Sequence, residues 1–139
     1  MTLPDDMKAH NRKVIEEFRA NGGRAPEGRQ LLLLTTTGAR TGQTRTTPMM
    51  FVPDGDRLLV FASNAGAPRH PDWYLNLVAH PEVRVEVAGE TYDATAVVTI
   101  SEERDRLFAR TGEKYPFFLD HQAKIARTIP VVALVRRGG

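Results

Sequence analysis

The sequence predicts a mainly β domain of the α+β class, an antiparallel sheet or barrel with short helices. Three observations lead to this fold: a length of 139 residues, about six segments with strand patterns, and connections that are mostly of hairpin length. Hairpin connections join antiparallel strands, whereas parallel strands need crossovers of about a dozen residues or more. The pattern therefore argues against a doubly wound parallel sheet and for a single domain over residues 1–139.

Before the strands, a helix is predicted over about residues 5–21. Its apolar residues share one helical face: Met7, Val14, Ile15 and Phe18. Residues 21–23, Asn-Gly-Gly, form a stop signal. We expect this helix to pack at the edge of the domain, and a weak contact with a membrane surface or a partner is the alternative.

The predicted strands cover residues 31–36, 46–52, 57–63, 83–87, 92–100 and 131–135. Turn signals at residues 53–56 and 88–90 predict two hairpins. Short helices are expected from Pro71 and over residues 101–110, the second with Ser101 as its capping residue. Residues 115–129 combine an aromatic segment with one further candidate helix.

The composition narrows the chemistry. Cysteine is absent, so thiolate nucleophiles, thiolate metal sites and disulfides are excluded. The four histidines lack the spacing of zinc ligands, so no metal site is expected. A net charge of +2 is too small to predict binding to nucleic acid. No apolar run reaches the roughly 20 residues of a membrane span, and residues 1–23 are too charged for a secretory signal, so the cytoplasm is the expected location.

One stretch of the chain indicates an anion-binding site. Four arginines lie in this stretch with a single acid, Glu27: Arg24, Arg29, Arg40 and Arg45. Within it, the turn at residues 37–42 has two glycines that let backbone amides approach a ligand, and two threonine hydroxyls. Together with Arg40 and Arg45 these groups are the parts of a phosphate site. The alternative is an ordinary polar turn with solvated arginines, and no P-loop motif is present.

A second stretch suits a planar ring. The strand ending at Ala62 and Ser63 is followed by a loop of small residues and by an aromatic helix start. Small side chains leave space for a ring, Trp73 and Tyr74 could form its walls, and Asn76 could position a neighbouring turn. The alternative, preferred for Trp73 taken alone, is that the aromatic residues belong to the core.

The segment from Tyr115 to Phe118, followed by His121, is the third candidate. Its aromatic residues could form a lid over an apolar substrate, with Tyr115 as a hydrogen-bond or proton donor. Phe117 and Phe118 could equally be core residues.

Together these motifs resemble one known family. Residues 34–45 (LTTTGARTGQTR), the loop at 62–68, the helix at 71–77 (PDWYLNL) and the segment 127–131 are similar to the deazaflavin-dependent nitroreductase family, over about residues 28–136. The resemblance implies a split β-barrel of the flavin-reductase and pyridoxamine-phosphate-oxidase type, with coenzyme F420 as the cofactor. It also implies a reductase that passes a hydride from the reduced deazaflavin to an electron-poor organic acceptor, such as an activated alkene, a quinone or a nitroaromatic.

The resemblance further implies roles for individual residues. Those expected to bind the coenzyme are Arg40, Thr41, Gly42, Arg45, Thr47, Pro48, Met49, Ala62, Ser63, Asn64, Ala67, Pro68, Trp73, Tyr74 and Asn76. The first four would hold the phosphate and the acidic tail, the next three would line the path inward, and the others would surround the ring. Tyr115, Phe118 and His121 would line the substrate pocket, and Ser63 and Tyr115 are the candidate catalytic donors.

Three positions depart from the family pattern. Many members have a lysine where this chain has Asn64, and the nitroimidazole-activating members have tyrosines at the positions of Phe118 and His121. Substrate and proton donor therefore stay open. The alternative functions are an oxidoreductase that uses flavin mononucleotide (FMN) on the same barrel and a non-enzymatic protein that binds F420. Split barrels of this kind often dimerise, so a homodimer is a further expectation.

Overall fold

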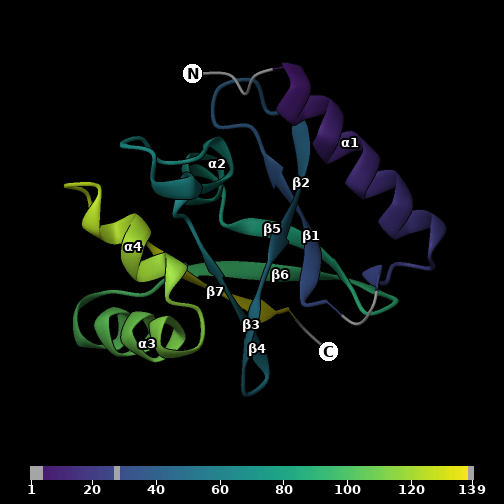
Figure 1. Ribbon diagram of the computed structural model, residues 1–139. Coiled ribbons are helices and arrows are strands. Elements are labelled where there is room, and N and C mark those ends of the chain that lie inside the picture. The colour runs from purple at the N-terminus through teal and green to yellow at the C-terminus, as the bar shows by residue number, and fades with distance from the viewer. Residues whose placement is uncertain (1–4, 27–28, 138–139) are drawn as a thin grey trace.

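The computed structural model describes residues 5–26 and 29–137, with side chains from residue 8 onward, so the expected place of Met7 on the helix face lies outside it. Figure 1 shows helices arranged around one curled sheet. The helices are α1 (Asp5–Ala20), α2 (Asp72–Ala79), α3 (Ser101–Lys114) and α4 (Phe117–Ala123), with a 3-10 turn, η2, at Asn64–Gly66. The strands are β1 (Leu31–Thr37), β2 (Thr44–Met50), β3 (Val52–Asp54), β4 (Arg57–Phe61), β5 (Glu82–Val87), β6 (Glu90–Val98) and β7 (Val131–Arg136).

The two ends of the sheet are joined at a bend in the chain between β2 and β3. Its order is β2-β1-β5-β6-β7-β4-β3, and every neighbouring pair is antiparallel. The two outermost strands, β2 and β3, are separated by Phe51 alone, whose N–H donates to the carbonyl of Gln30 (3.2 Å). The single strand predicted over residues 46–52 is therefore wrong: it bends at Phe51 and changes partner from β1 to β4. This bend joins the two ends of the sheet and gives the half-barrel its curl.

Two clusters of buried residues lie on opposite sides of the sheet. The inner cluster fills the barrel with side chains of β1, β4, β5, β6 and β7, and Leu77 of α2 completes it. The second cluster joins the outer faces of β4 and β7 to α3 and α4 through residues such as Phe61, Leu107 and Phe118. Both faces of β4 and β7 are thus covered, which explains the continuous apolar run over residues 131–135.

Helix α1 packs on the sheet beside β1 and β2 (Figure 1). Phe18 is 1% exposed, and Val14 and Ile15 are half-buried, so the apolar face of the helix is used inside the domain, as the edge-packing prediction expected. Arg19 fixes the helix further by donating two hydrogen bonds to Glu86 of β5 (3.0 and 2.8 Å). No helix in the described part of the chain is both long and apolar enough to cross a membrane.

Several local predictions are confirmed and others need correction. The β5–β6 hairpin turns at Ala88 and Gly89, both with positive φ (51° and 81°), as a two-residue turn requires. The strand predicted to reach residue 63 ends at Phe61. Helix α3 continues one turn beyond residue 110, because Thr111 and Gly112 are buried on its inner side. Ser101 does not cap it: Ser101 has φ 54°, and the preceding residue holds the capping position without a side-chain bond.

Candidate active site

Helix α2 fixes the turn that follows β1. Its Asn76 is only 9% exposed and reaches back to the turn that follows β1. The side-chain oxygen of Asn76 accepts a hydrogen bond from the N–H of Ala39 (3.0 Å), and its amide nitrogen donates to the hydroxyl of Thr36 (3.3 Å). A buried amide with both ends satisfied fixes its surroundings. The expectation that Asn76 positions a neighbouring turn is confirmed.

In that turn, over residues 37–44, three backbone N–H groups donate hydrogen bonds to other residues of the turn. Gly38 donates to the carbonyl of Gln43 (2.7 Å), Gly42 donates to the carbonyl of Gly38 (3.0 Å), and Gln43 donates to the hydroxyl of Thr41 (3.2 Å). A methyl group on Gly38 would lie 2.8 Å from that hydroxyl, so only glycine fits. The donors left to face a ligand are therefore mainly the guanidinium groups of Arg40 and Arg45 and the proton of the Thr41 hydroxyl.

Arg40 and Arg45 are exposed, and neither forms an ion pair with another described residue. Arg45 lies opposite Thr36 on β1. Because side chains alternate along a strand, Arg45, Thr47 and Met49 lie in one row toward the barrel interior. Pro48, opposite Leu33, lies on the outer face, so the structure does not bring Pro48 into this row.

The four-arginine stretch does not form one cluster in space. Arg24 and Arg29 line a separate pocket of about 390 Å³ with Gln30 and Phe51, at the start of β1. Arg40 and Arg45 lie beyond the other end of β1, and a seven-residue strand spans about 20 Å. The local excess of cations is therefore divided between two places, and only Arg40 and Arg45 lie at the turn.

The loop after β4 has an unusual backbone. Asn64, Ala65 and Gly66 follow one another with positive φ values of 50°, 54° and 81°. Glycine tolerates this conformation, but a non-glycine residue held there costs about 1–3 kcal/mol. A loop with two such residues needs strong contacts from its surroundings to persist.

Those contacts come from Arg127, to which the sequence analysis gave no role. Its guanidinium donates to the carbonyls of Ala62 (3.0 Å), Ser63 (2.9 Å) and Ala67 (3.2 and 3.0 Å), and it lies 3.1 Å from Nδ1 of His70. Burial lowers the pKa of Arg127. In the sequence, Arg127 is a cation just before an apolar strand, within the segment 127–131 that resembles the family, and neither feature indicates what its side chain contacts.

The same contacts orient the other side of the loop. In a trans peptide the N–H points opposite to the carbonyl. Since the carbonyls of Ala62 and Ser63 point to Arg127, the N–H groups of Ser63 and Asn64 point away from it. Within the described residues these two N–H groups have no hydrogen-bond partner. The loop therefore offers two adjacent donors, with the nearly buried Ser63 side chain beside them.

The predicted ring walls are partly core residues. Trp73 and Tyr74 are both half-buried and pack against the inner cluster, as the core alternative for Trp73 expects, and part of each side chain stays exposed. Tyr74 also lies against the ring of His70, with centroids 4.7 Å apart. Ala67 and Pro68 continue the loop outward, where Pro68 is exposed.

The structure does not bring together the three residues that were predicted to line the substrate pocket, Tyr115, Phe118 and His121. Phe118 is 3% exposed and packs on Phe61 at 4.8 Å between ring centroids, within the second cluster. The hydroxyl of Tyr115 lies 3.5 Å from the side chain of Gln30, at the start of β1. His121 instead lies against the loop, since a methyl group on Gly66 would be 3.5 Å from its Cδ2. Its Nδ1 is buried without a partner in the described part of the structure.

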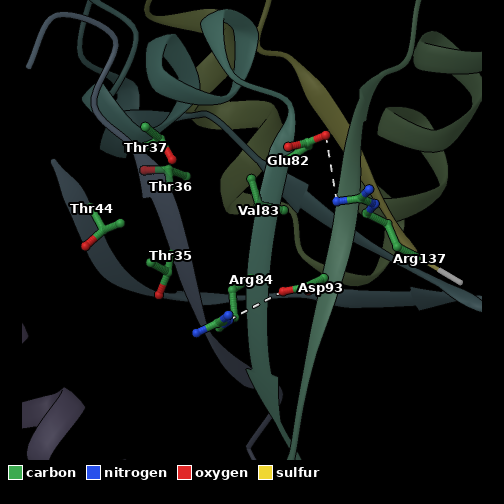
Figure 2. Close-up of a pocket in the computed structure, with 9 residues that line it drawn as sticks. All are labelled: Thr35, Thr36, Thr37, Thr44, Glu82, Val83, Arg84, Asp93 and Arg137. Carbon is green, nitrogen blue, oxygen red and sulfur yellow. Dashed lines mark hydrogen bonds and ion pairs between the residues drawn. The ribbon is translucent and has the colours of Figure 1, made fainter. Parts of the chain in front are cut away.

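A polar groove of about 320 Å³ lies on the outer face of β1, β5 and β6, beside the turn (Figure 2). Its threonines, Thr35, Thr37 and Thr44, offer hydroxyls, but its charges occur in pairs. Arg84 lies 3.4 Å from Asp93, and Arg137 lies 3.8 Å from Glu82, as the dashed lines show. Because these pairs compensate each other, the unpaired Arg40 and Arg45 remain the better anion site.

Solution pH should affect the loop through His70. Burial, and then the charge of Arg127, lower the pKa of His70 below its ordinary value of 6.5. A group with a lowered folded-state pKa stabilises the fold above the unfolded value and loses this contribution as the pH falls through the folded value. We expect denaturation between pH 8 and 5 to show this loss in the wild type and not in His70→Phe, which keeps a ring against Tyr74. An equal pH dependence of both proteins would contradict the assignment.

Comparison with known proteins identifies the family. A family model described as F420H(2)-dependent quinone reductase matches residues 7–136. The chain belongs to this family. A member from Mycobacterium tuberculosis, named F420H(2)-dependent quinone reductase, is 40% identical over 119 residues, which are 84% of this chain and 80% of that protein.

Solved structures agree with the F420H(2)-dependent quinone reductase assignment. One described as an F420-H2 dependent reductase, FDR-A, has a TM-score of 0.69 at 37% identity and covers 76% of this chain and 94% of its own. Another, described as a domain-swapped dimer, has a TM-score of 0.71 at 34% identity, with 88% and 95% covered. A Clostridium acetobutylicum protein of the pyridoxinephosphate oxidase family shares the fold alone, at 12% identity and a TM-score of 0.53 with 90% and 84% covered.

These similarities confirm the main expectations. The chain is an F420H2-dependent oxidoreductase with a split-barrel fold, and its coenzyme is F420. The alternatives, an FMN enzyme or a non-enzymatic F420 binder, are not favoured. The family name adds a quinone as the acceptor of its members.

Proposed function

We propose that this chain reduces a quinone with F420H2, and that its coenzyme site is formed by the turn after β1, which α2 fixes, and the loop after β4, which Arg127 fixes. The turn over residues 37–44 would hold the phosphate and the acidic tail through Arg40 and Arg45. The loop over residues 62–68 would lie beside the ring. The observation that carries the proposal has two parts. Arg40 in the turn and Arg45 at the start of β2 form no ion pair with another described residue, and on the other loop the N–H groups of Ser63 and Asn64 have no hydrogen-bond partner among the described residues.

The residues present fit the coenzyme chemically. A phosphate and carboxylates need guanidinium and hydroxyl donors, and Arg40, Arg45 and Thr41 provide them without competing acids. A ring with carbonyl edges needs donors, and the amides of Ser63 and Asn64 are unused. Near the same loop, the buried Nδ1 of His121 also lacks a partner. A bound polar group there would remove an unsatisfied buried atom.

When bound, reduced F420 supplies a hydride, and the quinone is the acceptor. The contribution of the protein is to orient and to stabilise charge. Small residues at Ala62 and Ser63 would let a ring approach the strand end closely. Hydroxyl and amide donors placed at a developing negative charge typically lower a barrier by about 3–4 kcal/mol each. Ser63 is the proposed donor. Tyr115, whose hydroxyl contacts Gln30 instead, would need to rotate to serve as one.

The proposal is tested by fluorescence titration of the purified protein with F420 and, separately, with FMN. We expect saturable binding of F420 and weaker or no binding of FMN. Oxidation of F420H2, followed by its absorbance, should then depend on an added quinone. Preferential binding of FMN would overturn the coenzyme assignment. Tight F420 binding with no consumption of F420H2 by quinones, alkenes or nitroaromatics would favour the non-enzymatic alternative.

The phosphate assignment gives a separate prediction for Arg45. Arg45→Ala should weaken F420 binding several-fold, because it removes one charge-assisted contact, which at an exposed side chain is worth less than the roughly 1.5–3 kcal/mol of a favourable geometry. The matched control is Arg106→Ala, which removes an exposed arginine on α3 and changes the net charge equally. An unchanged dissociation constant for Arg45→Ala, or an equal loss in both variants, would remove Arg45 from the site.

Two further parts of the proposal concern assembly and location. A homodimer is proposed because one similar structure is described as a domain-swapped dimer. Light scattering should then give twice the chain mass of 15.5 kDa. The cytoplasm is the proposed location, on the sequence argument alone, and cell fractionation would check it.

A further inference from the structure

The loop over residues 62–67 is stabilised mainly by residues that lie outside the loop. Its own backbone supplies two short-range hydrogen bonds, from Gly66 to the carbonyl of Ser63 and from Ala67 to that of Asn64 (both 3.0 Å). No side chain of the loop caps η2. The Asn64 side chain adds one hydrogen bond, to the carbonyl of Arg69 (3.0 Å). The left-handed run at residues 64–66 therefore depends largely on another group that fixes the neighbouring carbonyls.

Arg127 is that group, and its hydrogen-bonding capacity is fully used. A guanidinium has five N–H donors. Nε donates to Ala67, one terminal nitrogen to Ala62 and His70, and the other to Ser63 and Ala67. No donor remains for a substrate or a coenzyme. Arg127 can therefore act on the reaction only through the shape of the loop.

The position of Arg127 is itself fixed by the helices outside the barrel. The side chain of Gln122 in α4 donates to the carbonyl of Arg127 (2.7 Å) and accepts from the N–H of Ile129 (2.8 Å). Arg104 of α3 donates to the carbonyl of Ile129 (3.0 and 2.8 Å). The guanidinium is thus presented to the loop from a rigid support, which is what a positioning group requires.

We infer that Arg127 is a positioning residue for the coenzyme: it holds the loop at residues 62–67 in the shape that receives the ring and turns the amides of Ser63 and Asn64 outward. This inference rests on the proposed function, because it assumes that the ring lies at this loop. Lysine is a poor replacement, because an ammonium has three donors on one nitrogen, whereas the contacts of Arg127 use five donors directed from three nitrogens.

The first test is made without coenzyme. Amide hydrogen exchange at Gly66 and Ala67 should be about tenfold faster in Arg127→Lys than in the wild type, because loop opening becomes easier. The internal reference is the N–H of Ala96 in β6, which donates to the carbonyl of Pro81 and lies outside the loop. Its exchange rate should be unchanged. The matched control is Arg106→Lys, which makes the same change at an exposed position of α3 outside the contacts that support Arg127.

The second test uses F420. We expect Arg127→Lys and Arg127→Gln to raise the dissociation constant for F420 about tenfold and to lower kcat at saturating F420H2, whereas Arg106→Lys stays within twofold of the wild type. Unchanged exchange together with unchanged binding in both Arg127 variants would overturn the inference. Faster exchange confined to Gly66 and Ala67, in a protein whose wild type does not bind F420, would instead uphold the loop role and reject the coenzyme site.

Discussion

Phe118→Ala should lower the free energy of unfolding by about 3–5 kcal/mol, the largest effect expected of any single substitution considered for this chain. Phe118 is 3% exposed and contacts Phe61 and Phe117, with ring centroids 4.8 and 4.4 Å apart. Removing its ring leaves a cavity between the outer face of β4 and helix α4, which the surrounding side chains can fill only in part. Urea denaturation followed by circular dichroism measures the loss.

Phe117→Ala is the matched control, because the neighbouring ring is 42% exposed and its removal should cost far less stability. The pair also separates two roles for Phe118. If Phe118 lined the substrate pocket instead of the core, Phe118→Ala would change KM for the quinone and leave stability nearly intact. Equal stability losses in the two variants would contradict the core assignment.

Asn76→Ala should be the most damaging substitution for the coenzyme site itself. It removes the acceptor of the Ala39 N–H and the partner of Thr36, leaving polar groups unsatisfied in a nearly buried place. We expect stability to fall by about 1–3 kcal/mol. F420 binding should weaken by about tenfold or more, since the turn bearing Arg40 is no longer fixed to α2. Denaturation and F420 titration on the same preparation measure both.

Asn76→Asp is the informative companion. It keeps an oxygen for the Ala39 N–H but loses the donor to Thr36, so it should retain much of the F420 affinity that Asn76→Ala loses. If both variants bound F420 as the wild type does, the turn would hold its shape without α2. The proposed role of Asn76 in positioning the turn would then be wrong.

The sequence predicted the strands best where a single physical signal dominates. The runs at β1 and β7 are buried on both faces, and the β5–β6 hairpin carries a glycine where positive φ is needed. The bend at Phe51 was missed because the apolar pattern runs through it without a turn residue. It depends on which strands each half pairs with, and long-range pairing leaves no local mark.

The sequence predicted the residues of the candidate site better than it predicted their arrangement in space. The motif around Arg40 and Arg45 and the loop around Ser63 were both found from local chemistry, and Asn76 was expected to position a turn. Arg127 was not found, because its role arises from carbonyls more than 50 residues away. Arg24 and Arg29 were grouped with the turn because nearness in sequence does not reveal that a whole strand separates them.

The pairing of the strands sets the order in which this barrel can fold. The hairpins β1–β2, β3–β4 and β5–β6 join neighbouring segments, and each can form early and locally. Strand β7, which follows all the others in the chain, pairs with both β4 and β6 and so fills the last gap in the ring. Closure across such long sequence separations is slow, typically milliseconds to seconds. A nascent chain will therefore expose its inner apolar faces until β7 has been synthesised, and it is in this interval that assistance from a chaperone would matter most.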